Sequence, residues 1–214
     1  MKTKQGIKIS RVIYSILIIA LIASIINPIQ VNAASRTKKN AYKAYYKWMK
    51  SSEAKIYSGS SKKYYKKYSL IDLNKDGIPE LIAANPQYLN SNCYDYKICS
   101  FNGTTVETVS ISENRAAVGF IPKTGKLKSA YLSGAMGDFY STIYKINKKG
   151  NIVRIANLSE YGVLTPSPSY KINDKSVNKK TFVKKSKKIY NNKKEKGFHT
   201  LKFTSRKKML KKLK

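Results

Sequence analysis

The residues best suited to chemistry are oxygen-bearing side chains that recur within ten positions of the chain. Residues 72–81 read D-L-N-K-D-G-I-P-E-L, with oxygen donors at relative positions 1, 3, 5 and 9 and a glycine at position 6. A hard cation such as Ca²⁺ takes about six to eight oxygen ligands, and a tight turn directs alternate side chains and one carbonyl at a common centre. The glycine allows this turn, because it adopts a positive φ without a Cβ penalty. The predicted Ca²⁺ ligands are the side-chain oxygens of Asp72, Asn74 and Asp76, the carbonyl of Ile78, and Glu80 directly or through water.

A full EF-hand is not predicted around this loop. An EF-hand has a bidentate glutamate at position 12, where this chain has Ala83, and the flanking segments 68–72 and 80–84 are short and apolar, as strands are. The alternative to a calcium loop is a hairpin turn without metal, since Asn, Asp and Gly also form ordinary turns. Three of the eleven carboxylates of the chain fall within nine residues here, which favours the cation.

The loop also resembles known calcium-binding sequences. Residues 72–81 match the short D-x-[DN]-x-D-G-x-x-[DE]-L loops of secreted calcium-binding repeats, including FG-GAP modules and the first half of dockerin repeats. Residues 68–84, with the preceding Tyr/Trp-rich segment, are similar to a class of uncharacterised secreted proteins of low-GC Gram-positive bacteria that carry EF-hand-like loops. This resemblance implies a secreted protein in which Asp72, Asn74, Asp76 and Glu80 bind calcium.

The first thirty-three residues have the three parts of a secretory signal peptide. Four basic residues precede an apolar run at 12–26, and V-N-A at 31–33 is typical of a cleavage site. The run is shorter than the roughly 20 residues of a spanning helix, and no later stretch is long and apolar enough to cross a membrane. An uncleaved anchor is the alternative. The predicted organisation is a signal peptide at 1–33, a linker at 34–40 and one secreted domain at 41–214, with a basic segment at 170–214.

Charge predicts the class of partner. The chain has forty-three lysines and arginines against eleven acidic residues, a net charge of +32, and loss of the four positive charges of the leader leaves +28. Such a field attracts polyanions and carries no information about the fold. Outside a Gram-positive-like cell we expect these to be teichoic acid or anionic lipid, with no specific nucleic acid. Residues 170–214 carry eighteen of the basic residues against Asp174 and Glu195.

Cys93 and Cys99 are the only cysteines in the sequence. An oxidising compartment permits a disulfide between them. A straight strand from 93 to 99 would hold the two sulfurs far beyond bonding distance, because each residue adds about 3.3 Å. A disulfide therefore requires a turn near Tyr94 and Asp95, and two buried thiols are the alternative.

Few residues suggest catalysis. His199 is the single histidine, and the sequence has neither a G-x-S-x-G motif nor a His/Cys cluster for zinc. A glycosidase-like carboxylate pair could come from Glu107, Glu113, Asp138 or Glu160, which the sequence does not place together. We expect no enzymatic activity. A cell-wall hydrolase and a membrane-active basic protein are the alternative functions.

Apolar periodicity and turn residues predict an α+β fold. A helix is expected near 41–49 and two basic amphipathic helices near 182–190 and 209–213, the first after Asn178 as N-cap and the second after Thr204 and Ser205. Turn signals at 101–104, 123–125, 148–150 and 173–175 predict hairpins. Strands are expected at 96–101, 106–111, 118–121, 127–132, 140–146 and 152–158. We therefore predict an antiparallel meandering sheet, with the N-terminal helix packed on it and basic C-terminal helices.

Overall fold

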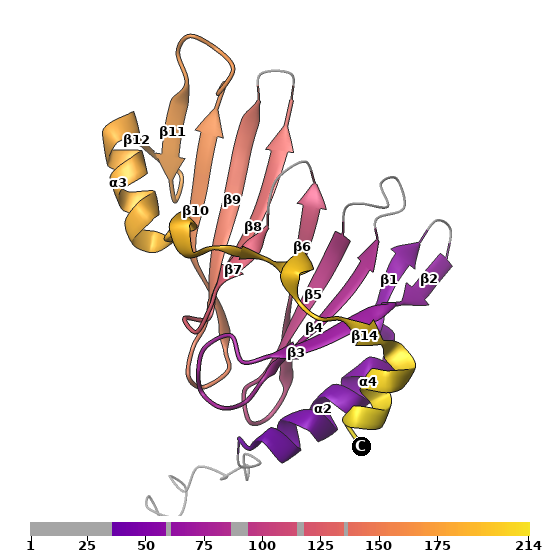
Figure 1. Cartoon of the computed structure of the whole chain (residues 1–214). Coiled ribbons are helices and arrows are strands. Elements are labelled where there is room, and N and C mark those ends of the chain that lie inside the picture. Colours follow the sequence, from indigo (N-terminus) through magenta and orange to yellow (C-terminus); the bar gives the residue numbers. More distant parts are fainter. Residues whose placement is uncertain (1–35, 59–60, 87–93, 115–117, 135–136) are drawn as a thin grey trace, which may run out of the picture. The chain divides into compact units, whose positions relative to one another are not determined.

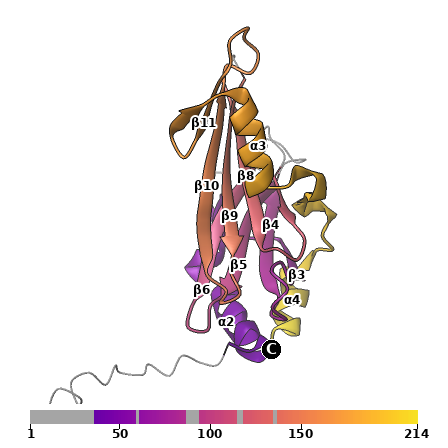
Figure 2. The ribbon, with the colours of Figure 1, turned by 90° about the vertical axis from the view of Figure 1, so that its left-hand side faces the viewer.

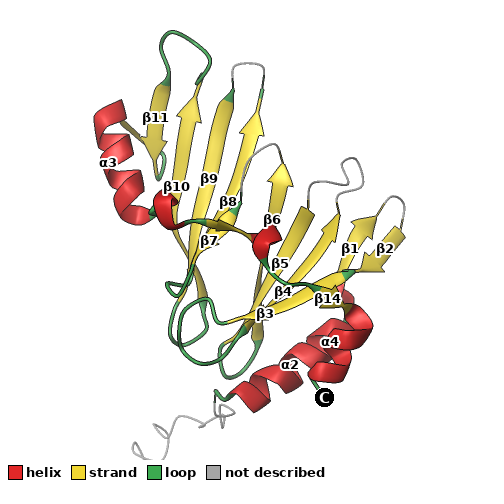
Figure 3. Ribbon diagram, in the orientation of Figure 1, coloured by secondary structure: helices red, strands yellow, loops and turns green. Residues whose placement is uncertain are grey.

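A computed structural model describes residues 36–58, 61–86, 94–114, 118–134 and 137–214 (Figure 1). Contacts divide the chain into two units, Met1–Ala33 and Ala34–Lys214, and all described residues belong to the second unit. The second unit is of the predicted α+β class, with strands in the majority (Figure 3). Its helices are α2 (Lys38–Lys50), α3 (Lys179–Ile189) and α4 (Arg206–Lys212), with short 3-10 turns η1 (Ser52–Ala54), η2 (Asn192–Lys194) and η3 (Phe198–Thr200).

The strands form a twelve-stranded sheet and a two-stranded hairpin. The hairpin is β1 (Lys55–Ser58) and β2 (Ser61–Tyr64). The larger sheet has the order β12-β11-β10-β9-β8-β6-β5-β4-β3-β14, and β7 joins it by pairing with both β8 and β13. Its strands are β3 (Lys67–Ile71), β4 (Glu80–Pro86), β5 (Tyr94–Phe101), β6 (Val106–Asn114), β7 (Gly119–Ile121), β8 (Lys126–Ser133), β9 (Asp138–Ile146), β10 (Ile152–Tyr161), β11 (Ser169–Ile172), β12 (Lys175–Val177), β13 (Lys196–Gly197) and β14 (Thr204–Ser205).

Chain neighbours pair in antiparallel fashion through most of this sheet, as the predicted meander requires. The exception is β6 with β8, which pair in parallel through Glu113↔Ala130 and Asn114↔Tyr131. All six strands expected between 96 and 158 are present. The chain turns at the predicted positions with residues at positive φ. Lys123 closes the β7–β8 connection in this way, and Asn173 closes the β11–β12 connection.

Helix α2 covers one face of β4 and β5, as predicted. It begins after Thr37, whose hydroxyl accepts a hydrogen bond from the Asn40 N–H at 3.2 Å. The Tyr45 hydroxyl accepts a hydrogen bond from the buried Phe101 N–H at 3.1 Å, which ties the helix to β5. The buried residues of this contact are Ala41, Tyr45, Trp48, Met49, Leu81, Ala83, Cys99 and Phe101.

The opposite face of β4 and β5 is also buried. There Ile82 and Ile98 pack in a second cluster with Phe120 and Leu127 from β7 and β8 and with Phe198 from the C-terminal segment. Successive residues of a strand point to opposite faces, so a strand that is covered on both sides needs apolar residues at every position. This explains why β4 reads L-I-A-A after Glu80, without polar alternation.

Both basic C-terminal helices are present close to the positions predicted from the sequence. Asn178 caps α3, with its side-chain oxygen accepting from the Thr181 N–H at 2.8 Å, and Ser205 caps α4. The chain between them runs along the sheet from α3 to α4 (Figures 1 and 2). Helix α4 packs Met209 against the cluster that contains α2. None of the helices in the described part of the chain is long and apolar enough to cross a membrane.

Candidate metal centre

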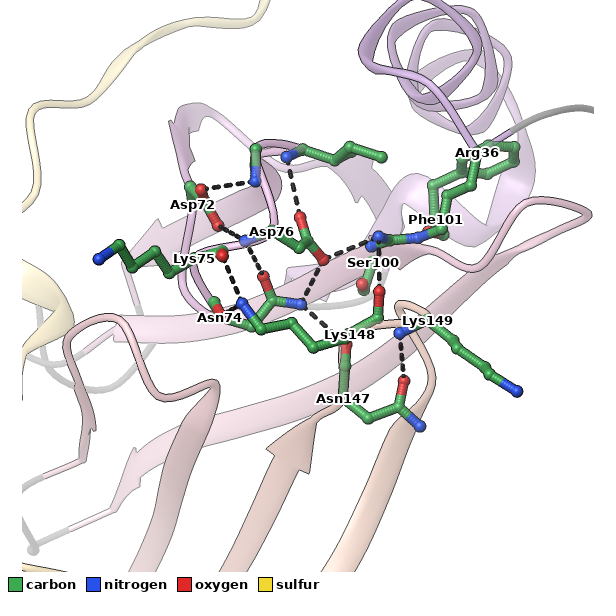
Figure 4. Close-up of polar contacts among 12 residues, drawn as sticks. Arg36, Asp72, Asn74, Lys75, Asp76, Ser100, Phe101, Asn147, Lys148 and Lys149 are labelled. Carbon is green, nitrogen blue, oxygen red and sulfur yellow. Dashed lines mark hydrogen bonds and ion pairs between the residues drawn. The ribbon is translucent and has the colours of Figure 1, made fainter.

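The loop between β3 and β4 folds back on itself through its own carboxylates. Asp72 accepts a hydrogen bond from the Gly77 N–H at 2.9 Å and one from the Asp76 N–H at 3.2 Å. Asn74 Oδ1 accepts from the same Asp76 N–H at 3.2 Å, and Asp76 Oδ1 accepts from the Ile78 N–H at 2.8 Å (Figure 4). Gly77 takes a φ of +87°, as its predicted role requires. The oxygens of loop positions 1, 3 and 5 are therefore gathered in one turn.

Glu80 lies behind this turn as the first residue of β4. Its side chain is fully buried, with Oε2 accepting from the Leu73 N–H at 2.8 Å and Oε1 from the Ser100 hydroxyl at 3.3 Å. Burial raises the pKa of this carboxyl from its ordinary 4.5 to about 8, against the Leu73 hydrogen bond, and the charges of Asp76 and Asp72 add to the rise. The negative charges of Asp72 and Asp76 therefore act on the Glu80 carboxyl. Glu80 also fixes the start of the turn, because it accepts the Leu73 N–H.

Arg36 supplies a positive charge to the loop. Its Nη1 donates to Asp76 Oδ2 at 2.7 Å, and the side chains of this ion pair are 16% and 6% exposed. The same guanidinium donates to the Phe101 carbonyl through Nε at 2.7 Å and to the Lys148 carbonyl through Nη1 at 3.0 Å (Figure 4). One carboxylate of the loop is therefore neutralised by a residue that precedes α2.

The β9–β10 turn supplies further contacts to the loop. Lys148 Nζ donates to the Asn74 carbonyl at 2.6 Å and also to the Lys75 carbonyl. Asn74 Nδ2 donates to the Asn147 carbonyl at 2.8 Å. Gly150 closes this turn at a φ of +81°, and a Cβ there would lie 2.7 Å from Arg36 Nε, so only glycine leaves room for the guanidinium.

The donor chemistry of the loop fits a hard cation. Asp72, Asn74 and Asp76 offer carboxylate and amide oxygens, which are the ligands that Ca²⁺ prefers. The structure brings these three predicted ligands together, whereas Glu80 is engaged by Leu73 and Ser100. Ile78 donates its N–H to Asp76 and packs its side chain in the cluster that contains α2. Within the described ranges, no group of three or more His, Cys, Asp or Glu side chains is arranged to hold a metal. Calcium ligation by the five residues stays a prediction.

Arg36, Asn147, Lys148 and Ser100 are the residues of this centre that sequence reasoning missed. The only signal for any of them was the turn predicted at 148–150. Nothing in the sequence indicated that this turn meets the loop, because the Lys148–Asn74 contact joins residues 74 positions apart.

The remaining predicted residues lie outside this centre. Cys99 is a buried thiol under α2, and burial raises its pKa well above the ordinary value. Cys93 falls outside the described residues, so the disulfide stays a prediction. Glu107 accepts from the Ile152 N–H at 2.6 Å and Asp138 from the Gly162 N–H at 2.8 Å, which gives both carboxylates a structural role.

Comparison of the chain with protein-family models, curated proteins and solved structures finds no match. The function is therefore inferred from the arrangement of the residues in this chain.

Proposed function

We propose that the protein is a secreted, non-catalytic, calcium-binding module that polyanions of the cell envelope retain by electrostatic attraction. The observation that carries this proposal is the dense positive charge on its exposed helices. All six lysines of α3 are exposed, as are all five of α2. The whole chain has eleven carboxylates for forty-three basic side chains, so internal ion pairs can neutralise only a minority of them.

The kind of partner follows from this surface. Clustered lysines bind phosphate as point charges, and neutralising a polyanion releases the counterions that surround it. Teichoic acid and anionic lipid headgroups both present phosphate outside a Gram-positive-like cell. Binding of this type depends on charge density and is weakened by salt.

The retention test uses purified teichoic acid and vesicles of phosphatidylglycerol, with phosphatidylcholine vesicles as the neutral control. We expect the protein to sediment with both anionic materials at low salt and to be released as the NaCl concentration is raised. It should not bind the neutral vesicles. Failure to bind either anionic material at low salt would contradict the proposed retention.

Calcium has an architectural role in this proposal. The loop contacts the Arg36 side chain and the β9–β10 turn, and Arg36 contacts the end of β5, so a cation in the loop would stabilise a junction of segments that are distant in sequence. A ligand that binds only the folded state adds stability of RT ln(1 + [L]/Kd), about 1.4 kcal/mol at tenfold saturation. Extracellular calcium can fill even a weak site with a Kd of about 10⁻⁴ to 10⁻³ M.

The calcium test compares Asp72→Asn with wild type. Asparagine keeps one oxygen, which can accept from the Gly77 N–H, while Asn74 Oδ1 still accepts from the Asp76 N–H. It removes a charge and one acceptor, so it should weaken calcium binding and cost only a small part of the stability in EGTA. We expect calcium to raise the Tm of wild type and of the control Asp174→Asn, whose side chain lies on an exposed turn. A wild-type Tm that is the same in calcium and in EGTA would remove calcium from the proposal.

A further inference from the structure

A hollow lies between α3 and the strands β10 and β11, away from the calcium loop. Its volume is about 360 Å³, and a smaller hollow of about 80 Å³ adjoins it. Glu160, Phe182, Ser186, Tyr190 and Asn192 line both. The lining residues of α3 follow helical spacing, because they form the face that the helix turns towards the sheet. The larger hollow has the size of a small-molecule site.

Glu160 is the one acidic residue among those that line the larger hollow. It is half-buried, and no described residue donates a hydrogen bond or forms an ion pair with its carboxylate. Burial raises the pKa of Glu160 above its ordinary value, and the positive charge of Lys179 offsets part of that rise. An unpaired carboxylate in a hollow is unexpected in a chain so rich in lysine, and groups of this kind cluster at functional sites.

Two buried polar atoms at the hollow also have no hydrogen-bond partner among the described residues. They are the Tyr190 hydroxyl, on a side chain that is 1% exposed, and Asn191 Oδ1. Buried polar groups are nearly always paired, because leaving one unpaired costs its desolvation energy. Both atoms are buried from solvent, so they belong to the wall of the hollow. Glu160 is the half-buried acceptor that a ligand with N–H donors can reach.

The rest of the lining is apolar inside and basic at the rim. The Tyr170 and Phe182 rings contact each other with centroids 5.2 Å apart, and Val183 of α3 is 54% exposed although it lines the hollow beside them. Lys179 and Lys187 stand exposed at the rim. A plain anion would meet Glu160, and a plain cation would meet the lysines and the positive field of the whole chain.

We propose that this hollow binds a zwitterionic α-amino acid with an apolar side chain. The ammonium group pairs with the Glu160 carboxylate, and the carboxylate of the ligand faces Lys179 and Lys187. The apolar side chain of the ligand packs against Phe182, Tyr170 and Val183. It would cover Val183, which is exposed in the folded chain. This site is separate from the calcium loop, and it shares Lys179 and Lys187 with the lysines of α3 on which the proposed retention rests.

The test measures ligand binding to the full chain by calorimetry and by NMR shift changes. Three probes share one ring: phenylalanine has both charged groups, hydrocinnamate lacks the ammonium, and phenethylamine lacks the carboxylate. We expect phenylalanine at about 10 mM to saturate a site with a Kd of about 1 mM, and both truncated probes to bind at least about tenfold more weakly. No binding of phenylalanine at this concentration, or equal binding of hydrocinnamate, would overturn the proposal.

Variants locate the binding. Glu160→Gln keeps the shape of the side chain and removes the charge-assisted hydrogen bond, so it should weaken phenylalanine binding about tenfold or more. Glu53→Gln, at an exposed position in η1, is the matched control and should bind as wild type does. Lys187→Gln should weaken phenylalanine but not phenethylamine. Thermal unfolding of each variant checks that it is folded, and undiminished binding by folded Glu160→Gln would refute the assignment.

Discussion

At the residue scale, Arg36 and a calcium ion would compete for the same carboxylate. Asp76 Oδ2 is 2.7 Å from Arg36 Nη1 and 2.6 Å from Asn74 Nδ2, so an ion that uses this oxygen must compete with both donors. Arg36→Ala should therefore raise calcium affinity, by roughly tenfold for the loss of one competing charge-assisted hydrogen bond. Calorimetric titration of the variant with calcium measures the change.

The same substitution should destabilise the protein in EGTA. Arg36 also donates to the Phe101 and Lys148 carbonyls, and we expect their loss to lower the free energy of unfolding by about 2 kcal/mol. Urea unfolding checks this, and Arg154→Ala, on an exposed position of β10, is the control. An Arg36→Ala protein with unchanged calcium affinity would show that Asp76 Oδ2 is not a ligand.

Glu80 predicts a pH dependence in the calcium-free protein. Its pKa is about 8 in the folded state against 4.5 ordinarily, so the folded state retains a proton that the unfolded chain has released. This contribution to stability is complete below pH 4.5 and is lost as pH rises through about 8. We expect the free energy of unfolding in EGTA to fall across this window, and Glu80→Gln to flatten the fall. A wild-type profile as flat as that of the variant would argue against a protonated Glu80.

At the scale of elements, α2 is attached to the sheet by one buried hydrogen bond in addition to apolar packing. The Tyr45 hydroxyl accepts from the Phe101 N–H, and Tyr45→Phe would leave that buried donor unpaired. We expect the free energy of unfolding to fall by about 1 to 3 kcal/mol. Tyr42→Phe makes the same chemical change at a half-buried position of α2 and should cost much less; similar losses for both would contradict the assigned role of the hydrogen bond.

At the scale of the whole molecule, the placement of charge should matter as well as its sum. Salt screens charges over about 8 Å at physiological ionic strength, so a polyanion feels the dense lysines of α3 more than dispersed ones. Changing Lys184, Lys185 and Lys188 to Gln should weaken teichoic acid binding and reduce its salt dependence. Changing Lys66, Lys145 and Lys202 to Gln removes the same charge from separate elements and should do less. If both triple variants weaken teichoic acid binding equally, binding depends on the net charge of the protein and not on where the lysines lie.

The sequence by itself determined most of the local structure. Apolar periodicity and capping residues such as Asn178 predicted the helices, and turns rich in Gly, Asn and Asp predicted the hairpins. Both signals act between residues that are a few positions apart. The tight turn at Gly77 was predictable for the same reason. The stripe on α3 was predicted only in part, since periodicity marks an apolar face but does not show that the sheet leaves Val183 uncovered.

Only the tertiary structure decided what surrounds the predicted loop. Arg36 lies 40 positions from Asp76, and Asn147 lies 73 positions from Asn74, so these contacts depend on how the sheet brings distant turns together. The acidic loop was predicted to bind a cation because three of the eleven carboxylates of the chain fall within nine residues. Folding supplies Arg36 and Lys148 from elsewhere in the chain, and the hollow beside Glu160 likewise exists only where α3 packs on β10 and β11. Sequence patterns record local preferences, whereas the electrostatic surroundings of a carboxylate depend on long-range contacts.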